Sequence, residues 1–174
     1  MAGLYSYKGK SPKIHKDVFL APEAVVVGDV EIGEGSSIWF NAVVRCDVSP
    51  VRIGKNTNIQ DNATVHVMHN NVTEIGDSVL IGHNVVVHST KIGNNVLIGS
   101  GANLGGYSEI GAFSVIAPET KVPQHKVIPA YSLVEGNPCH IVRRLREDEI
   151  EALEKSAEAY KALADDYADI NQNK

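Results

Sequence analysis

The sequence predicts an all-β fold, a parallel β-helix of hexapeptide repeats that is followed by one α-helix. Branched aliphatic residues recur at every sixth position through most of the chain, and glycine often follows them. The last stretch changes to a spacing of three and four. A period of six with an inward aliphatic residue is the signature of a parallel β-helix, in which three hexads close one triangular coil.

The aliphatic series is interrupted only by small changes of length. Three residues are inserted before Ile53 and four before Ile75, and one residue is missing before Ile92. Glycine follows the aliphatic position at residues 33, 54, 76, 82, 93, 99, 105 and 111, where a tight corner favours a residue without Cβ. The series occupies Ile14, Leu20, Val26, Ile32, Ile38, Val44, Ile53, Ile59, Val65, Ile75, Ile81, Val87, Ile92, Ile98, Leu104, Ile110, Ile116, Val122, Ile128 and Val134.

Stacking of these coils gives the chain its expected core. Neighbouring strands lie about 4.8 Å apart, so each aliphatic residue packs on its counterpart in the next coil. Each buried Val, Leu or Ile side chain contributes roughly 1.5–3 kcal/mol. The stretch from about residue 14 to residue 134 is similar to the hexapeptide-repeat proteins, and that resemblance implies a left-handed winding.

After Pro138 the pattern is that of an amphipathic helix. Within residues 147–170, apolar side chains recur three and four apart, and acidic residues fill the first turn, where they suit the helix dipole. We expect this stripe to dock on a flat side of the β-helix, although pairing with another helix would use the same face. Residues 1–140 are expected to form the left-handed β-helix domain and residues 141–174 a helical segment packed on it. The stripe comprises Ile150, Leu153, Ala157, Tyr160, Ala164 and Tyr167.

Composition excludes several classes of protein. A chain of 174 residues that is 43% apolar is expected to form one domain with a sizeable core, and its net charge of −5 is not that of a nucleic-acid binder. Residues 1–10 contain no apolar signal segment, and no apolar run approaches the roughly 18 residues that a membrane span requires. We therefore expect a cytoplasmic protein with no membrane or nucleic-acid partner.

The repeat places three polar side chains on one edge of the β-helix. Arg45, His66 and His88 each follow an aliphatic residue of one column, so they stack in successive coils. His66 and His88 are then about one strand spacing apart, which suits two imidazoles that share a metal ion. The column consists of Val44, Val65 and Val87.

His83 belongs to a different edge. It follows Ile81, which shares a column with Ile59, and Asp61 is expected directly beneath it. One side of a coil spans up to about 20 Å, whereas a zinc-bound histidine nitrogen lies about 2.1 Å from the metal. If one metal binds all three histidines, they must come from two chains, and a closed ring of three chains is the simplest arrangement.

The alternative interpretation of any one of these histidines is a turn or surface residue. Taken together, however, three neutral imidazoles with an open coordination position are typical of a catalytic zinc site. Histidine also suits iron or cobalt, so Fe²⁺ and Co²⁺ are possible in place of Zn²⁺.

Several polar motifs follow one another along the chain, namely Arg45-x-Asp47, Asn58-x-Gln60-Asp61, His66, His83 and His88. In order and spacing they resemble the motifs of the γ-class carbonic anhydrases. In that family the first and last histidines come from one subunit and the middle one from its neighbour, which implies His66, His83 and His88 as the metal ligands. The resemblance also implies that Gln60 hydrogen-bonds the metal-bound hydroxide and that Arg45, Asp47 and Asp61 make ion pairs at the subunit interface. Surface solvation is the alternative for these three charges.

This resemblance implies reversible hydration of carbon dioxide to bicarbonate by a metal-bound hydroxide in a homotrimer. The chain departs from the best-studied branch, which has a glutamate after the Arg-x-Asp unit and a long acidic loop. Here Val48 takes the first position, and the loop is reduced to residues 68–71. We expect His69 or buffer to carry the proton instead. Tyr160 is either a pocket residue or part of the docking stripe.

Two other functions remain open. A hexapeptide acyltransferase would use one interface histidine as general base to move an acyl group from a coenzyme A thioester. It would share the fold and the trimer, but it usually has a longer acceptor-binding insertion, which is absent here. A non-catalytic metal-binding or assembly protein is the other possibility.

Overall fold

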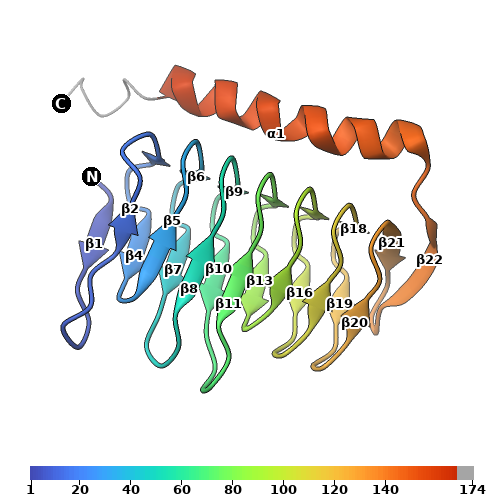
Figure 1. The fold of residues 1–174 in the computed structure, drawn as a ribbon, viewed down its shortest axis with the longest axis horizontal. Coiled ribbons are helices and arrows are strands. Elements are labelled where there is room, and N and C mark those ends of the chain that lie inside the picture. The colour runs from blue at the N-terminus through green and yellow to red at the C-terminus, as the bar shows by residue number, and fades with distance from the viewer. Residues whose placement is uncertain (168–174) are drawn as a thin grey trace.

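A computed structural model describes residues 1–167 and confirms the predicted parallel β-helix of hexapeptide repeats with one C-terminal helix. The strands form three sheets that are parallel except for the last strand, and we call them faces A, B and C in the order in which the chain first visits them. Figure 1 shows the coils stacked side by side along the long axis, with α1 (Glu147–Tyr167) lying across them.

Each face is built from short strands of successive coils. Face A is seven-stranded and contains β1 (Gly3–Tyr5), β4 (Val25–Val27), β7 (Val43–Arg45), β10 (Thr64–His66), β13 (Val86–His88), β16 (Asn103–Leu104) and β19 (Lys121–Val122). Face B is also seven-stranded and contains β2 (Lys13–Ile14), β5 (Val30–Ile32), β8 (Val51–Ile53), β11 (Thr73–Ile75), β14 (Lys91–Ile92), β17 (Glu109–Ile110) and β20 (Val127–Ile128). Face C contains β3 (Phe19–Leu20), β6 (Ser37–Ile38), β9 (Asn58–Ile59), β12 (Leu80–Ile81), β15 (Leu97–Ile98), β18 (Val115–Ile116), β21 (Ser132–Glu135) and β22 (His140–Arg144).

The register of the strands confirms the predicted columns. Val44, Val65 and Val87 pair in sequence on face A, and Ile59, Ile81 and Ile98 do so on face C. Because side chains alternate along a strand, every inward position of the middle coils joins one buried aliphatic core. The first coil is less covered, since Ile14 and Leu20 are only partly buried.

The sequence pattern placed the tight turn at the glycine that follows the aliphatic residue. In the structure, the turn and the glycine occupy different positions of the corner. Positive φ occurs three residues after the aliphatic position, for example at Asn62 (φ 60°) and Asn84 (φ 59°). The glycine that directly follows the aliphatic residue serves close stacking instead. A Cβ on Gly82 would lie 2.8 Å from the amide nitrogen of Ser100 in the next coil.

The connections from face A to face B differ most in length. The hairpin at residues 7–10, the loop at residues 46–50 and the loop at residues 67–72 project together at the edge opposite α1, which is the lower edge in Figure 1. The next connection has only residues 89–90, since β13 ends at His88 and β14 begins at Lys91. The insertions and the missing residue of the repeat therefore all occur at this one edge.

The helix covers face C. After β22 pairs antiparallel with β21, α1 runs back toward the end where the chain begins (Figure 1). Leu153, Ala157 and Ala164 are its buried residues, as the predicted stripe requires. Trp39 of the turn after β6 packs edge-on against Tyr160 and Tyr167. The predicted helical residues after Tyr167 lie outside the described part of the chain, and no helix within residues 1–167 is long and apolar enough to cross a membrane.

The outward side chains make the three faces chemically different. Face B carries a ladder of alternating charge in which neighbouring coils pair basic with acidic residues, and α1 lies over face C. Face A instead presents Val25, Val43, Thr64 and Val86 between its two edges. The ladder comprises Lys13, Glu31, Arg52, Glu74, Lys91 and Glu109.

Candidate metal centre

His66 and His88 lie together at one edge of face A, where the column pattern placed them. They are the last residues of β10 and β13 and are direct partners in the strand register. Their imidazole rings are stacked, with centroids 5.3 Å apart and an angle of 15° between the planes. Both rings point outward, because the preceding valines point into the core. The two histidines therefore form a pair on the surface of one chain.

A carboxylate and a guanidinium extend this pair into the preceding coil. A carboxylate oxygen of Asp47 lies 2.9 Å from Nε2 of His66, and the guanidinium of Arg45 donates a hydrogen bond to the same oxygen. The hydrogen bond from His66, and then the charge of Arg45, lower the pKa of Asp47. The prediction that Arg45, Asp47 and Asp61 make ion pairs between subunits concerns a second chain and stays a prediction.

His88 has the electrostatic environment of a neutral ligand. Burial of the ring, and then the proximity of His66, lower the pKa of His88 below its ordinary value. A metal binds the neutral imidazole, and a lowered pKa keeps that form present near neutrality.

His83 lies at the opposite edge of face A, in the turn between β12 and β13. Its Nδ1 is 3.0 Å from a carboxylate oxygen of Asp61, which occupies the equivalent turn one coil earlier. A carboxylate on one ring nitrogen fixes the tautomer and leaves the other nitrogen free as a ligand. The His83 side chain is half exposed, so this second nitrogen is open to a partner.

Gln60 precedes Asp61 in the same turn and is held by Asn58. Its Nε2 donates to Oδ1 of Asn58 at 3.1 Å, and both side chains are buried. Within residues 1–167, the Nδ2 atom of Asn58 is a buried donor with no partner. Asn58 thus fixes the side-chain amide of Gln60.

A groove joins Gln60 to His83 and Tyr160. It lies between face C and α1, has a volume of about 440 Å³ and has an apolar wall that includes Leu80 and Leu97. Tyr160 is compatible with both interpretations, a pocket residue and a member of the docking stripe. It lines this groove and also packs against Trp39, with 6.3 Å between the ring centroids. The groove opens beside the edge that carries His83.

His69 lies in the loop that follows His66, at the same edge of face A. It is exposed in the loop at residues 67–72, and its backbone carbonyl accepts a hydrogen bond of 3.1 Å from the hydroxyl of Tyr107. In the same loop, the thioether of Met68 lies over Gly106, where a Cβ would be 2.4 Å from Sδ. Met68 therefore fills the space that the glycines beyond His88 leave in the column.

The structure divides the predicted site residues into two groups on the two edges of face A. Arg45, Asp47, His66 and His88 form one group, and Gln60, Asp61, His83 and Tyr160 the other. No three histidine, cysteine, aspartate or glutamate side chains in residues 1–167 are grouped closely enough to hold a metal ion.

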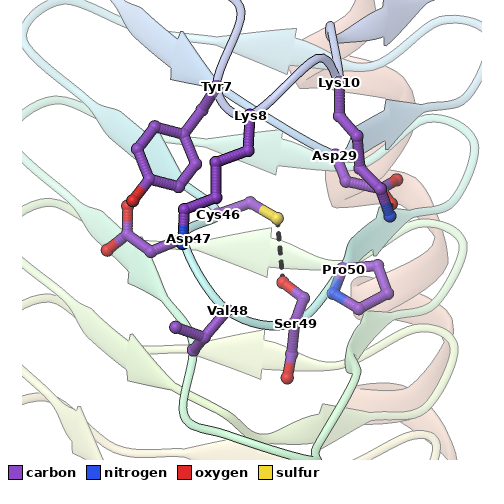
Figure 2. Close-up of a pocket in the computed structure, with 9 residues that line it drawn as sticks. All are labelled: Tyr7, Lys8, Lys10, Asp29, Cys46, Asp47, Val48, Ser49 and Pro50. Atoms are coloured by element: carbon purple, nitrogen blue, oxygen red, sulfur yellow. Dashed lines mark hydrogen bonds and ion pairs between the residues drawn. The ribbon is translucent and has the colours of Figure 1, made fainter.

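A smaller pocket borders the first group. It lies between the hairpin at residues 7–10 and the loop at residues 46–50, and has a volume of about 150 Å³ (Figure 2). The thiol of Cys46 donates to the carbonyl of Ser49 at 2.8 Å at its floor, and burial raises the pKa of that thiol. Among the predicted residues Asp47 alone lines this pocket.

Sequence reasoning missed several residues that shape the two edges. Leu97 lines the groove and Trp39 packs against Tyr160, because α1 folds back over face C. The sequence predicted that the helix docks on a flat side but not which one. Met68 and Ser89 contact each other across coils. The sequence did contain one indication of Ser89. The residue missing between Val87 and Ile92 marks an unusual corner directly after His88.

The six-residue repeat and the three stacked sheets define a hexapeptide-repeat β-helix protein. The repeat profile described as "Bacterial transferase hexapeptide (six repeats)" matches residues 11–46 and 72–106. The carbonic anhydrase of Geobacillus kaustophilus is 41% identical over 171 residues, which cover 98% of this chain and 94% of that protein. The chain belongs to the γ-class carbonic anhydrase family.

Other relatives differ in length and in name. Gamma carbonic anhydrase 2, mitochondrial, of Arabidopsis thaliana is 40% identical over 168 residues, and the chain spans about 60% of that relative's length. A solved structure from Bacillus cereus, provisionally named an acetyltransferase, has a TM-score of 0.95 at 37% identity and covers 97% of this chain and 98% of that one.

Proposed function

We propose that the protein catalyses the reversible hydration of carbon dioxide to bicarbonate at a metal site shared by two chains of a homotrimer. The observation that carries the proposal is the placement of His66 and His88 on one edge of face A and of His83 on the other. Family membership supports the reaction, since relatives of similar length are named carbonic anhydrases.

The donor chemistry fits a zinc ion. Three imidazoles form the ligand set of a catalytic zinc site, in which one coordination position stays open. Burial lowers the pKa of His88, which favours its neutral form, and half-exposed His83 has its Nδ1 beside Asp61. His66 has its Nε2 beside Asp47, so we expect this carboxylate to turn toward Arg45 when the nitrogen becomes a ligand.

Face A is the surface that a trimer would bury. Face B presents its charge ladder, and α1 lies over face C. Face A presents valines and carries candidate ligands on both edges. If each chain placed its His66 and His88 edge against the His83 edge of the next, three equal contacts would close a ring. Each contact would then assemble one complete site.

A bound zinc ion supplies the positive charge that makes water a stronger acid near neutral pH. The residues of this chain perform the remaining tasks. Gln60, fixed by Asn58, offers a side-chain amide that orients the attacking oxygen by a hydrogen bond. Leu80 and Leu97 give the groove an apolar wall that favours uncharged carbon dioxide over the bicarbonate ion. His69, exposed on its loop, is our candidate for transferring the proton to buffer.

The first experiment measures metal content and stopped-flow hydration on one preparation, purified without air and reloaded with zinc or iron. We expect about one metal per chain, fast hydration, and loss of both in His88→Ala. His125→Ala is the matched control, because His125 is exposed at the same edge and stacks on Tyr107, and we expect no effect. Metal binding without hydration would reject the proposed reaction and favour a non-catalytic metal-binding protein.

Acyl transfer is a second candidate because one observation favours it. His83 with its Asp61 partner, at the mouth of a groove, has the arrangement of a histidine general base. The resemblance to the Bacillus cereus structure fits this alternative. Release of free coenzyme A from acetyl-coenzyme A in the presence of amine acceptors, abolished by His83→Ala and independent of metal, would establish it.

A further inference from the structure

Ser89 is a buried residue that directly follows His88 and contacts the backbone that follows His66. It is 0% exposed and has φ of 55°. Its amide donates to the carbonyl of His66 at 3.0 Å, and its hydroxyl accepts a hydrogen bond from the amide of Met68. Two bonds from one residue therefore hold the backbone on both sides of Val67.

The carbonyl of Ser89 connects this corner to two further segments. It accepts a hydrogen bond of 2.7 Å from Nδ2 of Asn71 and one of 2.8 Å from the amide of Tyr107. The backbone amide of Asn71 in turn donates a hydrogen bond of 3.4 Å to Oγ of Ser49. Ser89 is thus the centre of a hydrogen-bond network that joins the loops at residues 46–50 and 67–72.

The length changes of the repeat explain why this network exists. The loop at residues 67–72 contains the four-residue insertion, and the corner after His88 is one residue short. The longer loop folds over the shortened corner, and Asn71 reaches the carbonyl that the missing residue leaves uncovered. Both changes meet at the edge that carries His66 and His88.

We infer that Ser89 is a positioning residue, which fixes the relative placement of His66 and His88 through its hydrogen bonds to the backbone of His66 and Met68. The inference rests on the proposed function, because it takes the two histidines as metal ligands. Buried groups that orient metal ligands contribute strongly, and their loss typically lowers metal affinity about 10–100-fold.

Ser89→Gly is the test variant, because glycine keeps the positive φ without strain and removes the side chain that carries the hydroxyl. Ser78→Gly is the matched control. Ser78 also has φ of 55°, and its amide makes the equivalent backbone bond, to the carbonyl of Lys55 at 2.8 Å, but it lies at the edge between faces B and C. Asn71→Ala is a second variant that removes the side-chain donor and leaves residue 89 unchanged.

Two measurements apply to each variant, namely amide hydrogen exchange at Met68 in the metal-free protein and zinc affinity by competition with a chelator. We expect Ser89→Gly to accelerate exchange at Met68 and to weaken zinc binding about 10–100-fold, with a smaller loss in Asn71→Ala and none in Ser78→Gly. Unchanged exchange, or faster exchange with unchanged zinc affinity, would overturn the inference. If the wild-type protein binds no zinc, the proposed function fails, while exchange at Met68 still decides whether the hydroxyl holds this loop.

Discussion

The imidazole rings of His66 and His88 are stacked with their centroids 5.3 Å apart, at the ends of two strands that are in register. Two nitrogens that bind one tetrahedral zinc ion, at about 2.1 Å each, lie about 3.4 Å apart. The rings must therefore tilt toward each other when a metal binds. Because the strands already hold both Cα atoms, we expect only side-chain rotation, and no change of coil register, on metal binding.

Replacement of His69 by alanine tests the proton-transfer role. His69 is exposed, and the loop is held through its backbone carbonyl by Tyr107, so the side chain is free for transfer. We expect His69→Ala to lower hydration about tenfold at low buffer, which is below the hundredfold or more typical of positioned acid–base groups. Imidazole buffer should restore the rate. Equal stopped-flow rates for variant and wild type at low buffer would exclude His69 as the shuttle.

Glu149 gives the stability of the helix start a defined pH dependence. Hydrogen bonds from Arg143, at 2.7 Å to each carboxylate oxygen, and then from the amide of Arg146 lower the pKa of Glu149 from 4.5 to about 2. A pKa lower in the folded than in the unfolded state adds stability above the unfolded value, and this is lost as the pH falls through the folded value. The loss should therefore extend from about pH 4.5 toward pH 2.

Urea unfolding midpoints of the wild type and Glu149→Gln measure this effect. We expect a difference between them at pH 7 that shrinks as the pH falls below about 4.5, because the protonated wild-type carboxyl then resembles the amide. Glu151→Gln is the control, since it leaves the bonds of Glu149 in place. A difference that is constant from pH 7 to pH 3 would show that this carboxylate is not the source.

Gly93 and Gly106 lie against different kinds of neighbour, one a rigid backbone and the other a flexible side chain. A Cβ on Gly93 would lie 2.7 Å from the amide nitrogen of Ala112, whereas one on Gly106 would meet the flexible end of Met68. We expect Gly93→Ala to destabilise the fold by about 1–3 kcal/mol, the range for overpacking, since the backbone of the next coil must shift. Gly106→Ala should lie within about 1 kcal/mol of the wild type, because Met68 can rotate and alanine lowers the entropy of the unfolded chain. Similar denaturation midpoints for both variants would contradict this distinction.

Tyr160 offers a way to separate packing from groove chemistry. Its ring meets Trp39 edge-on, a contact that is worth about 0.5–1.5 kcal/mol beyond the burial of area. Tyr160→Phe keeps that ring, so we expect thermal stability close to wild type, while Tyr160→Ala should lower it. If the hydroxyl acts on substrate in the groove, hydration by Tyr160→Phe falls several-fold at unchanged stability. If the tyrosine only docks the helix, its hydration rate stays at the wild-type value.

The repeat was sufficient to predict the strands and columns, because each aliphatic position has the same environment in every coil. Counting insertions placed His66 directly beside His88, and the register confirms that neighbourhood. The same counting placed Asp61 beneath His83, where the structure has the two side chains 3.0 Å apart.

What the sequence could not predict depends on contacts that have no period. The return of α1 over face C brings Tyr160 to Gln60, and only the tertiary fold determines this. The hydrogen bond from Met68 to Ser89 joins an insertion in one coil to a deletion in the next. Whether His83 joins the other two histidines depends on a second chain, because the two edges of face A lie apart within one chain.

Subunit complementation tests that last point directly. Suppose that a site takes His66 and His88 from one chain and His83 from its neighbour. A contact between the two variants then has all three histidines when the His83→Ala chain contributes His66 and His88 and the His88→Ala chain contributes His83. Random mixing of equal amounts into trimers should then restore about one quarter of the sites, from two variants that are inactive alone.

The control mixture combines His66→Ala with His88→Ala. These two histidines must come from the same chain, so no contact in this mixture is complete and neither zinc binding nor hydration should return. Zinc content and stopped-flow hydration are measured after the chains are unfolded together and refolded. Recovery in both mixtures would indicate exchange of individual ligands between chains, and recovery in neither would place all three histidines outside a shared interface site. Recovery in the first mixture alone follows only if face A is buried between chains with its two edges in contact.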